Sequence, residues 1–170
     1  MNAYILIGGS SRRMGQSKVA LFFDRVAAAA RGAFEDVYAV QRAGGEGGPG
    51  VETIFEEPHD DAAPVFGVRR ALEHACGRCF ILAVDYPRLS AELLRRLRAR
   101  FEASTALLMA PRADDKLHVL CAGYDSALLP RIDERIAQGR LDLRGLVTDV
   151  VDEETDELLN VNTPEDLHDA

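Results

Sequence analysis

The sequence predicts one α/β domain built around a mainly parallel sheet. Short apolar segments alternate with helical segments over most of the 170 residues, which is the pattern of strand–helix–strand units joined by right-handed crossovers. The length suits one domain, residues 1–170, with a sizeable hydrophobic core. Residues 78–84 (RCFILAV) are apolar on both faces, as expected of a central parallel strand that is covered on both sides.

The first half of the chain predicts three strands and a helix before residue 60. The apolar run of residues 3–7 stops at the glycine pair of residues 8–9 and indicates a buried strand. Residues 19–34 are rich in alanine, so a helix is expected there. Two further strands are expected at residues 36–41 and 51–55, joined by the glycine-rich residues 44–50 as a flexible surface connection.

The second half continues the alternation. Pro64 suits the first position of a helix that ends near Cys76, and Ser90 can cap a helix over residues 91–102. The remaining strands are expected at residues 105–110, 117–124 and 148–152, with a charged loop at residues 111–116. A helical segment is expected at residues 126–138, where Pro130 marks either a break or the helix start. A single helical turn is expected at residues 143–146, and a short terminal helix, capped by Thr163, is expected from Pro164 onwards.

Charge and hydropathy exclude several classes of function. The formal net charge of -8 argues against a broad nucleic-acid-binding surface, which is normally basic. No apolar run reaches the roughly 18 residues that a membrane-spanning helix needs, and the first apolar run is too short for a signal peptide. We therefore expect a cytoplasmic protein with no nucleic-acid and no membrane partner.

The three cysteines do not form an obvious functional set. An odd number of cysteines in a chain of this kind is not a disulfide framework. Cys76 and Cys79 form a CGRC motif, but a zinc or redox function needs a second ligand pair or a thioredoxin-like context. We expect them to be small apolar residues at a helix end and a strand start.

The polar segment after the first strand, GGSSRRMGQSK (residues 8–18), can bind phosphate. It offers backbone amides at Gly8 and Gly9, hydroxyls at Ser10 and Ser11, and positive charge at Arg12, Arg13 and Lys18. A helix that begins near its end adds the dipole of its N-terminus. The segment matches neither the Walker A motif nor the dinucleotide-binding GxGxxG motif. A glycine turn beside a solvated basic patch is the alternative interpretation.

Four motifs give this segment a more specific meaning. GGSSRRMGQSK with Leu21 matches GGxSxRMGxxKxxL, and it is followed in order by APVFGV (63–68), VDYP (84–87) and NVNTPEDL (160–167). The set resembles the signature motifs of the MobA-like nucleotidyltransferases, over nearly the whole chain. The resemblance implies a three-layer α/β/α, Rossmann-like nucleotidyltransferase domain with a mostly parallel sheet.

The resemblance is greatest to the molybdenum cofactor guanylyltransferases within this family, chiefly through NVNTPEDL. It implies Mg²⁺-dependent transfer of GMP from GTP to the terminal phosphate of molybdopterin, with release of pyrophosphate. GTP and molybdopterin are then the small-molecule substrates, and transient contact with molybdoenzymes or cofactor-insertion proteins is implied. Since both reactants are anionic and the attacking phosphate is already ionised, positioning and electrostatic stabilisation can do most of the work.

The same resemblance assigns roles to individual residues. Nucleotide binding is expected of Ile7, Gly8, Gly9, Ser10, Ser11, Arg13, Lys18, Glu57 and Asp85, and substrate binding of Asn160 and Asn162. Arg13, Lys18 and Asp85 are the expected catalytic residues, with Lys18 neutralising phosphate charge and Asp85 holding Mg²⁺. Asp85 could instead cap the turn that follows its strand, and the two asparagines could be turn residues before a capped helix.

Some positions differ from the family pattern. Ile7 stands where the family usually has alanine, beside the expected position of the nucleotide base. Both GTP and CTP are therefore open as donors. The identity of the phosphorylated acceptor is open as well. His118 is followed by Val119 rather than proline, and is either a substrate contact or a structural residue. A degenerate nucleotide-binding protein that serves a partner is a further alternative, against which the presence of both Lys18 and Asp85 argues.

Overall fold

The computed structural model describes residues 1–8, 18–59 and 61–160. All strands in these ranges belong to one mixed sheet. The strand order is β3-β2-β1-β4-β7-β5-β6, and β8 pairs with β5. The strands are β1 (Ala3–Leu6), β2 (Val37–Gln41), β3 (Glu52–Phe55), β4 (Arg78–Ala83), β5 (Leu108–Ala113), β6 (Lys116–Leu117), β7 (Cys121–Asp125) and β8 (Asp149–Asp152). Strands β1 to β4 pair in parallel, whereas β7 joins β4 and β5 in antiparallel fashion.

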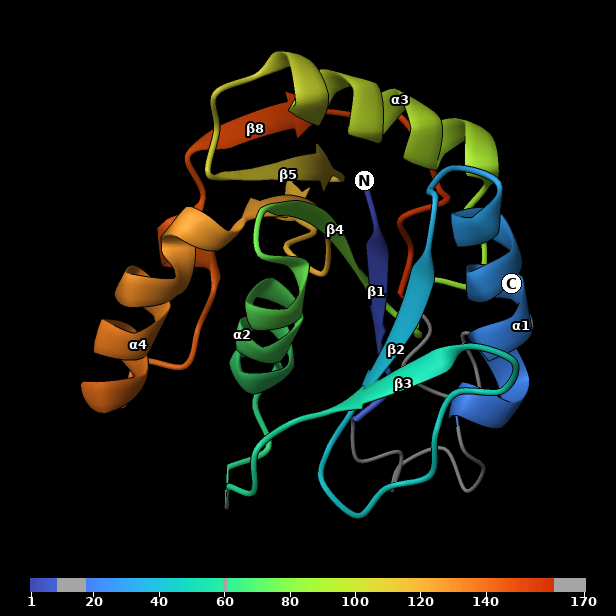
Figure 1. Cartoon of the computed structure of the whole chain (residues 1–170). Coiled ribbons are helices and arrows are strands. Elements are labelled where there is room, and N and C mark those ends of the chain that lie inside the picture. The colour runs from blue at the N-terminus through green and yellow to red at the C-terminus, as the bar shows by residue number, and fades with distance from the viewer. Residues whose placement is uncertain (9–17, 60, 161–170) are drawn as a thin grey trace.

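Helices cover both faces of this sheet. The helices α1 (Lys18–Arg31) and α3 (Ala91–Ala103) lie on one face, and α2 (Pro64–Ala75) and α4 (Leu129–Ala137) lie on the other (Figure 1). Each parallel connection passes through a helix or a long loop, because a parallel pair cannot be joined by a tight turn. The predicted three-layer α/β/α fold with a mostly parallel sheet is confirmed.

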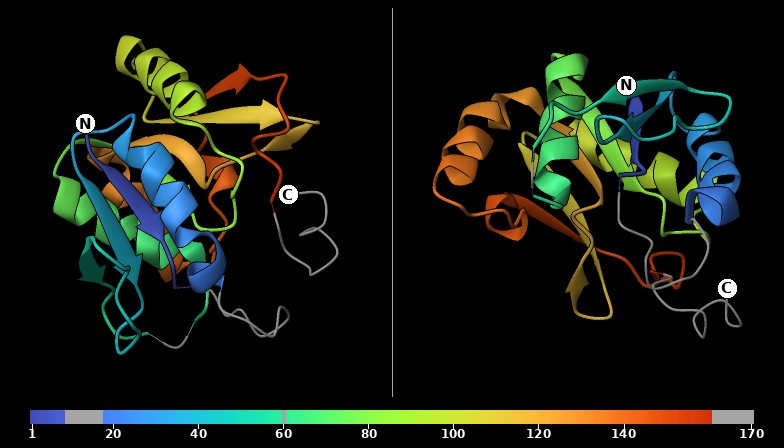
Figure 2. Two further views of the ribbon diagram at one scale, coloured as in Figure 1. Left: turned by 90° about the vertical axis from the view of Figure 1, so that its right-hand side faces the viewer. Right: turned by 90° about the horizontal axis from the view of Figure 1, so that it is seen from below.

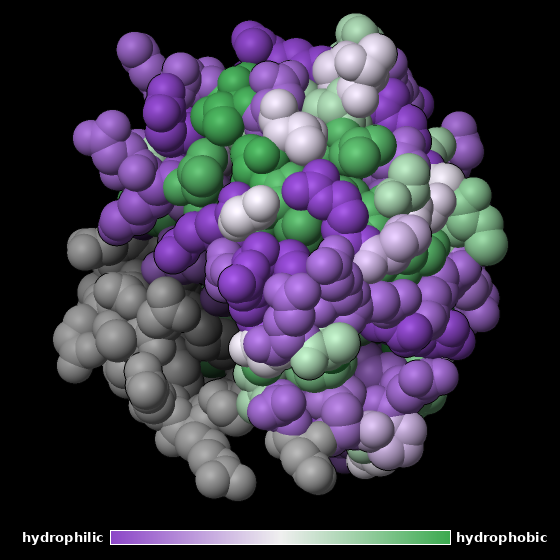
Figure 3. All heavy atoms as spheres, turned by 90° about the vertical axis from the view of Figure 1, so that its left-hand side faces the viewer, coloured by the Kyte–Doolittle hydropathy of each residue, from purple (hydrophilic) through white to green (hydrophobic). Residues whose placement is uncertain are grey.

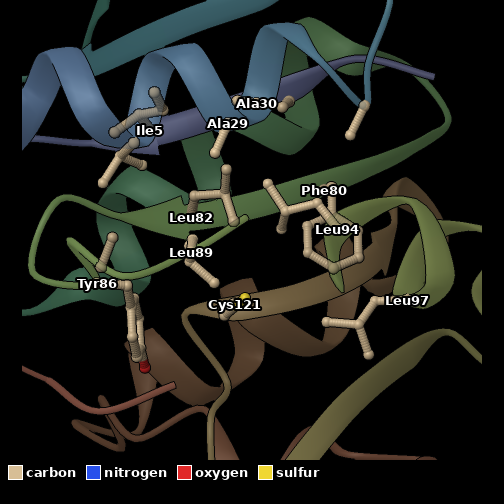
Figure 4. Packing of buried hydrophobic residues seen from close by; sticks show 14 of the residues in the cluster. Ile5, Ala29, Ala30, Phe80, Leu82, Tyr86, Leu89, Leu94, Leu97 and Cys121 are labelled. Carbon is tan, nitrogen blue, oxygen red and sulfur yellow. The ribbon is translucent and has the colours of Figure 1, made fainter. Parts of the chain in front are cut away.

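Alternating side chains of the central strands fill the two layers between sheet and helices. Ile5 of β1 and Leu82 of β4 belong to the cluster under α1 and α3 (Figure 4), whereas Tyr4 and Ile81, one residue away on each strand, belong to the cluster under α2 and α4. All four side chains are fully buried. Successive residues of a strand point to opposite faces, so strands that are buried on both sides read as continuous apolar runs.

Several local predictions are confirmed. The Ser90 hydroxyl accepts a hydrogen bond from the Leu93 amide at 3.1 Å and caps α3. Pro130 lies in the first turn of α4, where its missing N–H costs nothing. Cys76 ends α2 in the left-handed region with φ of 49°, while Cys79 is buried in β4. These are the helix-end and strand positions expected for the two cysteines.

Two predictions about the later strands are wrong. The strand expected at residues 105–110 begins and ends three residues later, as β5. Residues 111–116, expected to be a charged loop, form the end of the hairpin that β5 makes with β6. Asp114 and Asp115, with φ of 49° and 58°, form its two-residue turn, and turns of this kind need positive φ at both central residues. The hydrophobic pattern did not detect the hairpin because its tip is polar. The hairpin extends from the body of the domain (Figure 2).

The single strand expected at residues 117–124 is divided into β6 and β7. The His118 amide donates to the carbonyl of Pro111 at 2.9 Å, and the Cys121 amide donates to the carbonyl of His118 at 2.9 Å. The second bond closes a tight turn, after which the chain enters β7, which pairs with β4 and with the first residues of β5. An apolar run does not reveal which strand each half will pair with.

The face that carries α4 and β8 is mostly hydrophilic, and hydrophobic side chains gather in its upper part between hydrophilic ones (Figure 3). Val150 of β8 is 39% exposed, and apolar atoms contribute much of the surface of any folded protein. In the parts of the chain that the structure describes, no helix combines the length and the apolar character that a membrane crossing requires.

Gly123 of β7 provides a test of the packing between α3 and the sheet. A Cβ at this position would lie 2.3 Å from Cδ1 of Phe101. The Arg78 guanidinium lies 3.7 Å from the centre of the same ring and donates to the carbonyls of Phe101 and Ser104, so the ring has little freedom to move. We expect Gly123→Ala to lower the free energy of unfolding by about 2 kcal/mol, measured by urea denaturation.

Gly77→Ala is the matched control for this prediction. The nearest atom to a Cβ at Gly77 is the carbonyl oxygen of Ala75, 3.9 Å away, so the free energy of unfolding of this variant should lie within about 0.5 kcal/mol of the wild-type value. Replacing Phe101 by leucine in the Gly123→Ala background should cost less than the two single changes together, because the clash is then relieved. Equal stabilities of Gly123→Ala and Gly77→Ala would contradict the proposed clash.

Candidate functional site

Two neighbouring parallel strands end at the point where the order of the sheet reverses. Leu6 of β1 lies opposite Ala83 of β4, and the Val84 amide still donates to the carbonyl of Leu6 at 3.3 Å. Gly8 and Asp85 follow two residues beyond this pair on their own strands. Since β2 and β3 lie on one side of β1 and β4 lies on the other, this edge is a topological switch point, where ligands bind in open α/β sheets.

Close contact with β2 explains why a glycine follows β1. A Cβ at Gly8 would lie 3.0 Å from Cγ of Arg42 and 3.3 Å from its backbone nitrogen. Ile7 is 3% exposed and donates its amide to the carbonyl of Val40 at 2.9 Å. The chain therefore leaves the sheet at Gly8 with its backbone pressed against the end of β2, and α1 begins at Lys18.

The other predicted nucleotide ligands of this loop, and one of the two asparagines, cannot be placed. These are Gly9, Ser10, Ser11, Arg13 and Asn162, which lie outside the described residues, as does the helix expected from Pro164. Lys18 is the first residue of α1. The roles of these residues stay predictions, and the position of the loop is fixed at its two ends only.

The turn after β4 brings together residues from three parts of the chain. Asp85 is partly exposed, and Tyr86 next to it is 3% exposed. The Tyr86 hydroxyl lies 3.3 Å from Nδ1 of His118, in the turn that divides β6 from β7, and the side chain of Asn160 lies nearby. His118 is buried, which makes it a structural neighbour of the site. Its place could not be predicted because a sequence does not show this contact across 32 residues.

Burial determines the protonation state of this pair. It raises the pKa of the Tyr86 hydroxyl far above its usual value, so the phenol stays protonated. Burial also lowers the pKa of His118, although the backbone carbonyl of Ala113 partly opposes the shift. Both groups are therefore neutral near pH 7. They can hold other residues in place, but they supply no charge to the site.

The acidic residues after β3 differ in their surroundings. Glu56 is buried, and its carboxylate lies 2.7 Å from Nε2 of His59, whose ring stacks on Phe66 with 3.9 Å between centres. The predicted ligand Glu57 is exposed, with its carboxylate 3.7 Å from Arg69, and its nucleotide contact stays a prediction. The sequence does not show that Glu56, the first acidic residue after the strand, is the one that is buried.

Gly67, in the APVFGV motif, makes room for the Glu56 carboxylate. A Cβ at Gly67 would lie 2.9 Å from Oε1 of Glu56 and 3.1 Å from Cδ2 of Leu6. A surface pocket of about 300 Å³ lies beside these residues, lined by Arg42, Ala43, Glu57, Pro58 and His59. The ends of β2 and β3 therefore provide a polar hollow on the Gly8 side of the switch point.

The segment after β8 reaches the opposite side of the same edge. Its carboxylates bind the start of α3 and the preceding turn: Glu157 accepts from the Ser90 amide at 2.7 Å, Asp156 pairs with Arg88 at 3.1 Å, and Glu153 pairs with Arg96 at 2.9 Å. Asn160 follows and lies near Tyr86. Asn160 and Asp85 are thereby brought to one edge, although 75 positions separate them in the sequence.

Known proteins resemble this chain in sequence and in fold. The sequence model of the MobA-like NTP transferase domain matches residues 3–154. A protein from Aquifex aeolicus (strain VF5), named probable molybdenum cofactor guanylyltransferase, is 31% identical over 96% of this chain and 87% of its own length. A crystal structure of a protein from Aquifex aeolicus VF5 matches with a TM-score of 0.79 and 26% identity over 95% of this chain and 93% of that one.

A second solved structure supports the fold alone. The molybdopterin-guanine dinucleotide biosynthesis protein A from Archaeoglobus fulgidus has a TM-score of 0.77 at 23% identity, over 99% of this chain and 96% of that one. The family match covers both strand ends of the switch point, the buried Glu56 and the hairpin. On this evidence the chain belongs to the MobA-like NTP transferase domain family.

Proposed function

We propose that this protein transfers GMP from GTP to the terminal phosphate of molybdopterin and releases pyrophosphate, in a reaction that needs Mg²⁺. The observation that carries the proposal is the register of β1 and β4, which brings Gly8 and Asp85 to one edge of the sheet. The name and the 31% identity of the Aquifex aeolicus relative support the choice of GTP and molybdopterin. We place the reaction in the cytoplasm, with the product passed to molybdoenzymes or cofactor-insertion proteins.

The reaction is a displacement at phosphorus. An oxygen of the acceptor phosphate forms a bond to the α-phosphorus of GTP, and the bond from that phosphorus to the bridging oxygen of pyrophosphate breaks. The attacking oxygen is already ionised, so no side chain has to remove a proton. Neutral Tyr86 and His118 agree with this requirement. The protein has to hold two anions in line and offset their repulsion.

The donor half of the site would be formed by the segment that follows β1. Its backbone amides and the N-terminus of α1 favour phosphate binding, and Lys18 opens that helix. The glycine at position 8 lets the chain leave β1 in contact with Arg42. The polar hollow at the ends of β2 and β3 lies on the same side and gives the nucleoside a place beside the loop.

The residues at this edge fit a magnesium ion that is held mainly by substrate. Within the described ranges, no three His, Cys, Asp or Glu side chains are grouped to hold a metal. Magnesium commonly binds through one or two carboxylates together with substrate phosphates and water, and Asp85 presents one partly exposed carboxylate at the switch point. A bound Mg²⁺ would neutralise charge on the triphosphate and on the leaving group.

The test is a transfer assay with a choice of donor. Purified protein is incubated with Mg²⁺, molybdopterin and either labelled GTP or labelled CTP, and pyrophosphate and the labelled product are measured. We expect both with GTP, little with CTP, and neither without molybdopterin or after chelation of the metal. Release with CTP alone would overturn the choice of guanylyl transfer. No release with either nucleotide would overturn the proposed function.

A further inference from the structure

Two reverse turns lie against each other at the switch-point edge of the sheet. Residues 86–89 form the first, which follows β4, and residues 156–159 form the second, which follows β8. In each, the amide of the last residue donates to the carbonyl of the first, at 3.4 Å and 3.1 Å respectively. We call them the β4 turn and the β8 turn. Asn160, the expected acceptor-binding residue, directly follows the β8 turn, so its position depends on what holds that turn.

The start of α3, just after the β4 turn, contains half of a capping box. In this motif the N-cap hydroxyl accepts from the backbone amide three residues on, and a Glu or Gln at that third position accepts from the N-cap amide. The Ser90 hydroxyl accepts from the Leu93 amide at 3.1 Å, so the first half is present. A leucine side chain has no acceptor, so this position of α3 cannot supply the second half.

Glu157 of the β8 turn supplies the missing half. Its carboxylate accepts a hydrogen bond from the Ser90 amide at 2.7 Å, although 67 positions separate the two residues in the sequence. The place suits an anion, because the N-terminus of a helix carries partial positive charge. A hydrogen bond to a charged acceptor is also stronger than one between neutral groups. Glu157 therefore completes the cap of α3 and ties the β8 turn to it.

The other contacts of the β8 turn give it less orientation. Leu158 is 1% exposed and belongs to the hydrophobic cluster that includes Leu89 (Figure 4), but hydrophobic contact is not directional. Asp156 pairs with Arg88 at 3.1 Å, but its side chain is 75% exposed, so water and salt weaken the pair. The bond from the Ser90 amide to the partly buried Glu157 is thus the contact that sets the orientation of the turn.

We propose that Glu157 is a positioning residue, which holds the β8 turn against α3 so that Asn160 is presented to the acceptor substrate. The inference rests on the proposed function, in which Asn160 contacts the acceptor. Glu157 acts through the backbone of the β8 turn and touches neither substrate. The β4 turn directly follows Asp85, so the same bond keeps the acceptor-binding residue in place relative to the expected metal ligand.

Two neighbouring residues provide matched controls. Ser90→Ala removes the cap hydroxyl and so weakens the start of α3, but it keeps the backbone amide that binds Glu157. Glu92→Gln removes a negative charge from the first turn of the same helix, where the side chain is 78% exposed. These variants reproduce the loss of helix capping and the loss of charge, and they leave the link between the two turns intact.

The test measures KM values in the transfer assay. We expect Glu157→Ala to raise the KM for molybdopterin about fivefold, as the loss of one orienting hydrogen bond implies, and to leave the KM for GTP within about twofold of the wild type. Glu157→Gln keeps an oxygen that can accept from the Ser90 amide, so both constants should stay within about twofold. Ser90→Ala and Glu92→Gln should change neither constant, although Ser90→Ala should lower the urea midpoint of unfolding.

Three results would overturn the inference. The first is an unchanged molybdopterin KM in Glu157→Ala. The second is an equal rise in the KM for GTP, which would indicate a general loosening of the site. The third is a rise in Ser90→Ala as large as that in Glu157→Ala, which would show that only the stability of α3 matters.

Asn160→Ala tests the route of the effect, and its exposed position favours normal folding. It should raise the molybdopterin KM at least as much as Glu157→Ala, and adding Glu157→Ala to it should cause no further rise. Effects that multiply in the double variant would contradict the proposed action through Asn160. Wild-type protein that releases no pyrophosphate would overturn the proposed function itself, an outcome that these ratios between variants cannot produce.

Discussion

Asp85→Asn is expected to reduce kcat for pyrophosphate release by about a hundredfold or more, while the protein stays folded. The substitution keeps the size and shape of the side chain and removes its charge. Asp85 lies two residues beyond the end of β4 and is partly exposed at the switch point. Loss of one charged group that acts on a phosphoryl transition state commonly costs this much.

The measurement is steady-state transfer at saturating GTP and molybdopterin over a series of Mg²⁺ concentrations. If Asp85 holds the ion, the variant should need more Mg²⁺ to reach half of its own maximal rate. Asp36→Asn is the control: it removes an exposed carboxylate just before β2, at the opposite end of the parallel strands, and should leave kcat within about twofold. An Asp85→Asn enzyme with wild-type kcat and Mg²⁺ dependence would remove Asp85 from the mechanism.

The sequence predicted the parts of the site that depend on chain order and strand polarity. Gly8 and Asp85 directly follow apolar runs, and parallel strands bring their carboxyl ends to one edge. Their proximity therefore needed no knowledge of side-chain contacts. The cap at Ser90 and the helix start at Pro130 were also predictable, because both depend on residues close in sequence.

The parts that were missed depend on register and on long-range packing. At the turn around His118 the chain passes from β6, which pairs with the end of β5, to β7, which pairs with β4 and with the start of β5, and an apolar run does not specify a partner strand. Glu56 and Glu57 are adjacent acidic residues in the sequence. Only the fold shows that Glu56 turns inward to His59 and Gly67, while Glu57 turns outward to Arg69.

Lys18→Ala is expected to lower kcat/KM for GTP about a hundredfold. Lys18 is the first residue of α1 and the last residue of the segment that the sequence predicts to bind phosphate. Without the lysine, the N-terminus of α1 still offers its amides and its dipole, but the partial charge of a helix terminus is about half an elementary charge. A full positive charge near the phosphates stabilises both the bound triphosphate and the transition state.

A variant series separates charge from geometry at Lys18. Lys18→Arg keeps the positive charge but carries it on a longer and planar group. Its loss of kcat/KM should therefore be smaller than the loss in Lys18→Ala, but not zero. Arg25→Ala removes one positive charge from an exposed position further along α1 and should leave kcat/KM within about twofold, because exposed charges are screened. If Lys18→Ala and Arg25→Ala behaved alike, the segment after β1 would act through its net charge alone. A loss confined to Lys18→Ala, partly restored by arginine, instead requires a charge held at the start of α1, beside the switch point where we propose that the triphosphate binds.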